Sequence, residues 1–172
     1  ATVILLFTTG YPVMSETTRP EPQAIAVTLV DGSDTEKTLA TFQSHNQKVV
    51  ANANGIFMTY LRDNNETDDK ETDVWRLLYS QDRGGSFSTL YEGRGNTRAP
   101  VIETDAENNI YLAHPEYGSP AGQQQDFLFY RFPAAGNYRQ PSVETFAEVP
   151  CAAKYAMVYD APRKQFYIAT QY

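Results

Sequence analysis

The stretch Ser80-Gln81-Asp82-Arg83-Gly84-Gly85-Ser86-Phe87 lies between two runs of residues that favour strands. The first run covers 73–80 and the second covers 87–91, and both are rich in aromatic, β-branched and long apolar side chains. The residues between them are mostly Asp, Gly and Ser, types that dominate tight turns. The stretch therefore predicts a β-hairpin.

Strand-like runs of the same kind recur along all 172 residues. No window has the sustained apolar spacing of a helix, and Gly, Pro, Asn and Asp interrupt the chain at short intervals. The predicted strands are approximately 2–8, 24–30, 38–43, 47–51, 56–62, 73–80, 87–91, 100–104, 109–114, 126–132, 142–148, 154–159 and 165–171. The chain is therefore expected to be all-β.

Three segments of the chain resemble one another at a regular distance. Asn54–Tyr60, Asn108–His114 and Lys164–Thr170 start 54 and 56 residues apart. A repeat of about 50 residues with four strands in each unit is typical of β-propeller blades. We expect four-stranded antiparallel blades, with strands A to D from the innermost outward, at approximately 1–43, 47–93, 98–148 and 153–172.

The first of these units begins partway through a blade, and the last ends after its second strand. About three and a quarter blades are present, whereas propellers have about four to eight blades. The chain is therefore expected to be part of a larger propeller of about six or seven blades. The remaining blades would come from the same chain or another one. A compact β-sandwich is the alternative, because regular short strands and turns also allow that fold.

Five residues of the opening stretch carry a resemblance to a known family. Ser80, Asp82, Gly84, Ser86 and Phe87 match the pattern of an Asp-box, the hairpin-turn signature of sialidase-type (BNR-repeat) β-propellers. In that family the Asp and Ser side chains hold the turn, Gly permits its tight backbone, and the aromatic ring packs into the blade. The resemblance implies that Asp82 is structural. It also implies a carbohydrate-active protein, with a sialidase-like glycoside hydrolase acting on acidic glycans as the first expectation.

By the same resemblance, the D–A and B–C loops of the blades form the functional face. Arginines in these loops are candidates for binding a substrate carboxylate, because a guanidinium pairs with a carboxylate in a bidentate manner. The candidate substrate-binding residues are Arg62, Arg94 and Arg98. Arg98 is the first of them, since it comes just before a predicted innermost strand. A solvated loop arginine is the alternative.

Three residues around the end of a predicted B strand, His114, Glu116 and Tyr117, are candidates for catalysis. A His with a nearby Tyr can act as base and acid in β-elimination on an acidic sugar, so a propeller-type uronate polysaccharide lyase is a further expectation. A sialidase needs an arginine triad, a Tyr–Glu pair and an acid–base Asp, and a complete set cannot be assigned in this chain. For His114 the alternative is a buried, hydrogen-bonded strand residue. For the chain it is a non-catalytic propeller that binds a glycan or a protein.

Composition argues against several other classes of function. A net charge of −7 with scattered basic residues disfavours nucleic acid as a partner. The single cysteine, Cys151, allows neither an intrachain disulfide nor a thiolate cluster. No apolar run is long enough to span a bilayer, and no nucleotide- or metal-binding motif occurs. We expect no cofactor and no metal, and we expect the acidic stretch 63–69 to be a solvated loop because it lacks EF-hand spacing.

The family resemblance also implies an extracellular or periplasmic protein whose partner is a glycan or polysaccharide. The chain begins with Ala1 and not with Met. This fits the processing of a secreted protein, and it fits a fragment equally well.

Overall fold

A computed structural model describes residues 41, 46–62, 74–94, 98–116, 124–150 and 154–171. These residues form ten β-strands and one turn of 3-10 helix, η2 (Ala134–Gly136). No described helix is long and apolar enough to cross a membrane. The expected blade at 1–43, with strands at 2–8 and 24–30, falls outside the described residues except for Thr41, as does most of the strand at 38–43.

Two sheets of four strands and one hairpin make up the fold. The first sheet contains β1 (Val49–Asn52), β2 (Gly55–Arg62), β3 (Val74–Ser80) and β4 (Ser88–Arg94). The second contains β5 (Val101–Thr104), β6 (Ile110–Pro115), β7 (Gln124–Phe132) and β8 (Ser142–Pro150). The hairpin contains β9 (Lys154–Asp160) and β10 (Gln165–Gln171).

Each strand pairs antiparallel with the strand that follows it in the same sheet, so both four-stranded sheets keep the order of the sequence. The prediction of an all-β chain built from four-stranded antiparallel sheets is confirmed. The strand after the opening stretch is longer than predicted: β4 continues beyond Tyr91 as far as Arg94.

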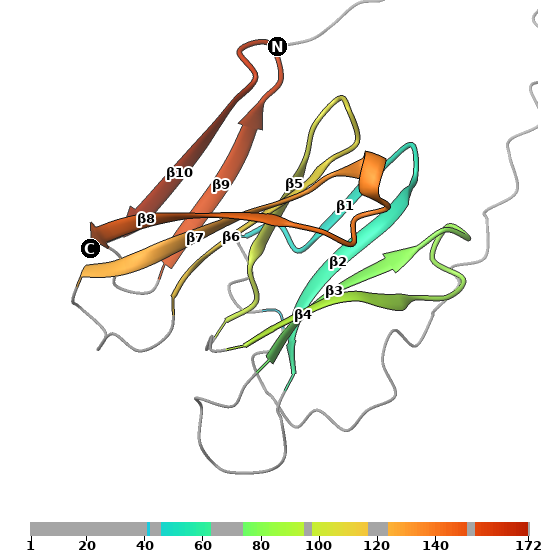
Figure 1. The fold of residues 1–172 in the computed structure, drawn as a ribbon, viewed down its shortest axis with the longest axis horizontal. Coiled ribbons are helices and arrows are strands. Elements are labelled where there is room, and N and C mark those ends of the chain that lie inside the picture. Colours follow the sequence, from blue (N-terminus) through green and yellow to red (C-terminus); the bar gives the residue numbers. More distant parts are fainter. Residues whose placement is uncertain are drawn as a thin grey trace, which may run out of the picture.

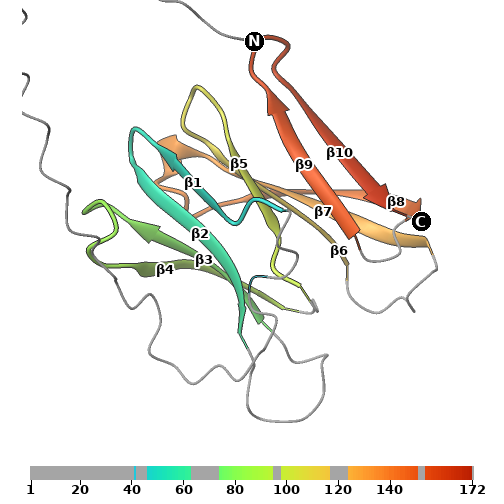
Figure 2. The same cartoon turned by 180° about the vertical axis from the view of Figure 1, so that it is seen from behind.

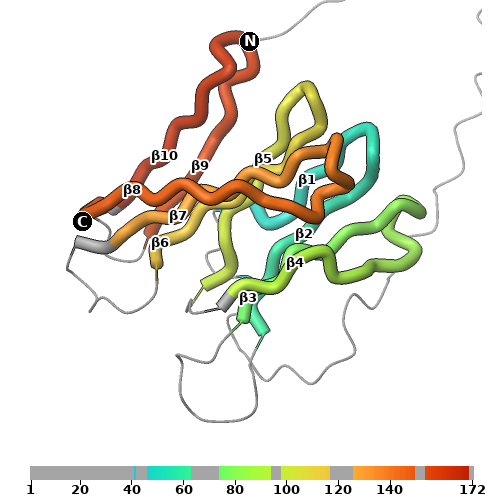
Figure 3. The backbone as a smooth tube through the Cα atoms, in the orientation of Figure 1, coloured from blue at the N-terminus to red at the C-terminus, as the bar shows by residue number. Residues whose placement is uncertain are grey.

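The three sheets lie side by side with their first strands in contact. β1 contacts β5, and β5 contacts β9. Figures 1 and 2 show, from opposite sides, the β5–β8 sheet between the β1–β4 sheet and the β9–β10 hairpin, and Figure 3 traces the same path of the backbone. The described sheets do not close into a ring. The arrangement is compatible with adjacent blades of a partial propeller.

Strand β6 of the middle sheet is covered on both faces, and every one of its residues is buried, whereas β8 at the edge of the same sheet is largely exposed. Successive side chains of a strand point to opposite faces. Ile110 and Leu112 pack against the first sheet, in a core that includes Trp75. Tyr111 and Ala113 belong to a second core, to which the hairpin contributes Tyr155 and Met157. The two cores hold the three sheets together.

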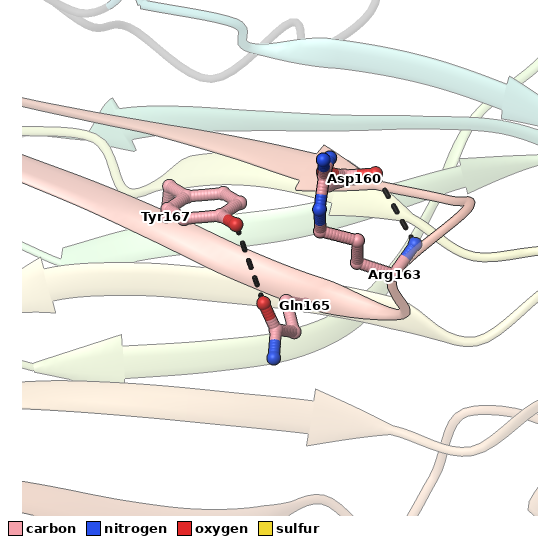
Figure 4. Close-up of polar contacts among 4 residues, drawn as sticks. All are labelled: Asp160, Arg163, Gln165 and Tyr167. Carbon is pink, nitrogen blue, oxygen red and sulfur yellow. Dashed lines mark hydrogen bonds and ion pairs between the residues drawn. The ribbon is translucent and has the colours of Figure 1, made fainter.

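The turn between β9 and β10 is fixed by Asp160 (Figure 4). Its Oδ1 atom accepts a hydrogen bond from the backbone N–H of Arg163 at 3.2 Å, and its Oδ2 atom forms an ion pair with Arg163 Nη1 at 2.6 Å. Lys164 completes the turn with a left-handed φ of 53°. Beyond it, the Tyr167 hydroxyl donates to Gln165 Oε1 at 3.2 Å.

The hairpin has only two strands and leaves apolar surface uncovered. Val158 and Tyr167 are 55% and 50% exposed. An apolar cavity of about 340 Å³ lies between the hairpin and the second sheet. It is lined by Phe127, Phe146, Val149, Phe166, Ile168 and Thr170. Within the described chain, this hairpin is the sheet with fewer than four strands.

Candidate functional site

The turn between β3 and β4 brings together the five residues of the Asp-box pattern. Asp82 Oδ1 accepts hydrogen bonds from Ser80 Oγ and from the backbone N–H of Ser86, both at 2.8 Å. Asp82 Oδ2 accepts from Ser86 Oγ at 2.7 Å, and Ser80 Oγ accepts from the N–H of Gly84 at 2.8 Å. Gly84 has a φ of 91°, and Phe87 is half-buried. The carboxylate therefore bonds to groups of its own turn.

The same hydrogen bonds shift the acidity of this carboxyl group. Donation from the Ser86 hydroxyl and backbone, and then from the Ser80 hydroxyl, lowers the pKa of Asp82 to about 2. Hydrogen bonds to an ionised carboxylate favour its charged form. Asp82 is therefore anionic at neutral pH, and its geometry is that of a structural residue.

The candidate arginines of the first sheet lie at the opposite end of its strands. Arg62 is the last residue of β2 and is paired in register with Val74, which in turn pairs with Arg94 at the end of β4. The turn that contains Asp82 follows Ser80, at the far end of β3. Arg62 and Arg94 therefore share one end of the sheet. Arg94 ends a strand, whereas the sequence placed it in a loop.

Arg62 also carries an unpaired donor. Within the described part of the chain, its Nε atom is buried without a hydrogen-bond partner. Leaving a buried N–H of a charged group unpaired is costly, and an acceptor that reaches it gains a charge-assisted hydrogen bond. The Nε atom itself is enclosed, so its missing partner is a feature of the packing around Arg62.

The start of the second sheet lies at this same end. Arg98 is half-buried and precedes Ala99, whose carbonyl oxygen accepts a hydrogen bond from Lys48 Nζ at 2.7 Å. Lys48 Nζ also donates to the carbonyl of Pro100, at 3.2 Å, and the Tyr155 hydroxyl donates to Ala99 from the hairpin, at 3.1 Å. Ala99 therefore joins all three sheets.

Lys48 lies at this end as well, although the sequence does not mark it as a candidate, and burial strongly perturbs its acidity. It is 8% exposed, and burial lowers its pKa to about 7. A lysine with such a pKa exchanges its proton near neutral pH, which is a property of functional lysines as well as of buried structural ones. Lysine is ordinarily exposed, so the sequence alone carries no signal for this residue.

His114 lies in the core between the first and second sheets. The ring is 1% exposed, stacks on Tyr130 with centroids 5.5 Å apart, and meets Trp75 edge-on at 5.4 Å. Its Nδ1 atom lies 2.8 Å from the carbonyl oxygen of Pro115, to which a neutral imidazole can donate. Burial lowers the pKa of His114 to about 4. The imidazole is therefore neutral at neutral pH.

Two polar atoms of this core remain without partners in the described structure, His114 Nε2 and Trp75 Nε1. Tyr130 adds a third polar group, whose pKa is raised to about 12 by burial and by the proximity of Tyr91 and Glu116. The sequence suggested Tyr117 as the partner of His114. In the structure, the aromatic residue that stacks on the imidazole is Tyr130, from the neighbouring strand.

The remaining candidate residues are either exposed or outside the described part of the chain. Glu116 is exposed, and its backbone N–H donates to Asp126 at 2.7 Å. Tyr117, Cys151 and the acidic stretch 63–69 lie outside the described residues. Among the residues that are described, no three His, Cys, Asp or Glu side chains are placed to hold a metal ion.

Comparison with known proteins adds no family assignment. A scan against protein-family models and searches of curated proteins and of solved structures found no match to this chain.

Proposed function

We propose that this chain is part of a carbohydrate-active Asp-box propeller, a sialidase-like glycoside hydrolase that acts on acidic glycans. The substrate carboxylate binds at the end of the sheets opposite the Asp82 turn. The observation that carries the proposal is that Arg62, Arg94 and Arg98 come from two neighbouring sheets and belong to this one end.

The chemistry of arginine supports this assignment. The chain as a whole has a net charge of −7, and the acidic stretch 63–69 follows Arg62 directly, so the arginines are the groups at this end that pair with an anion. Arginine is well suited to a sugar carboxylate because its planar guanidinium donates two parallel hydrogen bonds.

The experiment is a turnover assay with purified protein. A fluorogenic sialoside, sialyllactose and a polyuronate are incubated separately, and free sialic acid or unsaturated uronate is measured. The proposal expects release of sialic acid, with a loss of about tenfold or more in kcat/KM for Arg98→Ala, the scale of one charge-assisted hydrogen bond. Arg163→Ala is the matched control, because Arg163 lies in the β9–β10 turn. Release of unsaturated uronate instead would identify a lyase, and no release from any substrate would reject catalysis.

A second candidate is a propeller that binds a glycan or a protein without turnover. The burial of His114 favours it, because a neutral imidazole enclosed between two sheets meets side chains and not a substrate. Binding of sialyllactose that depends on Arg98, with no product formed, would support this candidate over hydrolysis.

The proposal includes further blades and secretion. The apolar cavity beside the hairpin and the exposed Val158 and Tyr167 are surface that two more strands and a neighbouring blade would cover. Exposed apolar patches of this kind mark interaction surfaces. The extracellular or periplasmic location rests on the family resemblance and is part of the same proposal.

A further inference from the structure

A cavity of about 580 Å³ lies at the Asp82 end of the strands, away from the arginines of the proposed acidic-glycan site. Its walls come from two sheets: the β3–β4 turn on one side, and the connection between β7 and β8 on the other. The volume falls within the range of about 300–1,000 Å³ that small-molecule sites occupy. We propose that this cavity binds a neutral oligosaccharide, at a site separate from the acidic-glycan site.

The aromatic part of the wall is rigid. Tyr79 stacks on Phe57 with centroids 4.6 Å apart, and its hydroxyl donates to the carbonyl of Asn54 at 2.7 Å. Tyr138 meets Phe57 edge-on at 4.7 Å, and its hydroxyl donates to the carbonyl of Asn108 at 3.0 Å. Rings that are held in this way lose little conformational freedom when a ligand binds.

The backbone on the second side is fixed as well. Asn137 and Tyr138 adopt left-handed conformations with φ of 50° and 62°. Their N–H groups donate to the carbonyls of Ala134, at 3.0 Å, and Pro133, at 3.1 Å. The direction of the chain at Asn137 and at the following Arg139 is therefore set by the turn.

Polar groups along the cavity have hydrogen-bonding capacity left for a ligand. Asn137 and Arg139 are exposed, and in the described structure neither side chain makes a hydrogen bond. Gln81 donates to the Tyr79 hydroxyl through Nε2, at 3.1 Å, which orients its amide while leaving the amide oxygen as an acceptor. The cavity thus offers a guanidinium and two amides beside the half-buried rings of Tyr79 and Phe87, while Tyr138, only 3% exposed, supports the wall from behind.

This combination fits a sugar better than an ion. A pyranose has an apolar face of C–H groups that packs on an aromatic ring, and hydroxyls around its rim that both donate and accept. Phe87, which is half-buried, adds apolar surface to the same cavity. Asp82 disfavours an anionic ligand and Arg139 disfavours a cationic one, so an uncharged ligand matches both walls.

The test is a titration of the full chain, labelled with nitrogen-15, with five neutral hexasaccharides: cellohexaose, xylohexaose, mannohexaose, maltohexaose and chitohexaose. The variants are Arg139→Ala and Asn137→Gly, since glycine tolerates the left-handed φ of Asn137. Neither side chain has a partner among the described residues, so both variants are expected to fold like the original chain. Arg163→Ala and Arg98→Ala are the controls.

The proposal expects at least one hexasaccharide to shift the amide signals of Ser86, Ser88 and Asn137. Arg139→Ala is expected to weaken that binding by about tenfold or more, the loss of one hydrogen bond to a charged group. Arg163→Ala and Arg98→Ala should leave it unchanged. Absence of binding by all five sugars, or binding that neither Arg139→Ala nor Asn137→Gly weakens, would overturn the proposal. Either result leaves the acidic-glycan site to be judged by its own assay, because that site depends on Arg98.

Discussion

Lys48 Nζ lies 2.7 Å from the carbonyl oxygen of Ala99, and this hydrogen bond joins the first sheet to the second. The Tyr155 hydroxyl reaches the same carbonyl from the hairpin, at 3.1 Å. Because three sheets meet at one backbone oxygen, the end of the strands that carries Arg98 is held by polar contacts as well as by apolar packing. Since substrate recognition is proposed at this end, its stability bears on the proposed function.

The lowered pKa of Lys48 predicts an unusual dependence of stability on pH. The unfolded amine loses its proton near 10.5, whereas the folded amine loses it near 7. Between these values folding releases a proton, so the contribution of Lys48 to the free energy of unfolding rises with pH. Urea unfolding is expected to show a gain of ~3 kcal/mol from this residue between about pH 7 and pH 9.5. Lys48→Met should abolish the gain. An identical pH profile for the variant would contradict the assignment.

Gly93 is predicted to be indispensable for the position of Trp75. A Cβ atom at Gly93 would lie 2.2 Å from Trp75 Cε2, and the indole is fully buried. Gly93→Ala therefore forces overpacking, with an expected loss of about 1–3 kcal/mol in the free energy of unfolding. Gly136→Ala is the matched control, since a Cβ there meets nothing within 4 Å. Equal urea midpoints for the two variants would contradict the prediction, because they would mean that the Trp75 ring moves aside without a loss of stability.

Asp82→Asn tests the turn. The amide cannot accept all the hydrogen bonds that Ser80 and Ser86 donate to the carboxylate, so the melting temperature is expected to fall by several degrees. The pKa of Asp82, about 2, lies below its ordinary value of 3.8. Its contribution is therefore present above that ordinary value and is lost as the pH falls through 2. The melting temperatures of the original chain and of Asp82→Asn should approach each other as the pH falls towards 2. A difference that stays constant from neutral to acid pH would contradict a stabilising role of the ionised carboxylate.

His114 is predicted to titrate far below an ordinary histidine. Its pKa is lowered to about 4 by burial, against an ordinary value of 6.5. The unfolded chain binds a proton between these values and the folded chain does not, so stability from this residue is lost as the pH falls from 6.5 towards 4. Proton NMR of the imidazole, assigned with His114→Gln, should give a midpoint below about pH 5. A midpoint near 6.5 would place the ring in contact with water.

The strands and the Ser80–Phe87 turn could be predicted from the sequence because their signals are local. Alternation of apolar residues and a turn motif lie within a few positions of one another. The extension of β4 to Arg94 was missed because its Gly and Glu residues resemble a loop, whereas register pairing with β3 keeps them in the sheet.

The contacts between sheets could not be predicted in the same way. Lys48 and Ala99 are 51 residues apart, and no periodic pattern connects them. The stacking of Tyr130 on His114 depends on the register of β6 with β7, which a single sequence does not specify to one residue. A family resemblance predicts which loops and arginines are candidates for binding. It does not predict which side chains are buried, because burial depends on how neighbouring sheets pack.

Recognition of an acidic glycan is tested most directly by calorimetric titration of the protein with sialyllactose, carried out in parallel on Arg98→Ala and Arg163→Ala. We expect saturable binding that Arg98→Ala weakens by about tenfold or more and that Arg163→Ala leaves unchanged. No binding to the original chain, or binding of equal strength in Arg98→Ala, would contradict recognition of an acidic glycan at this end of the sheets.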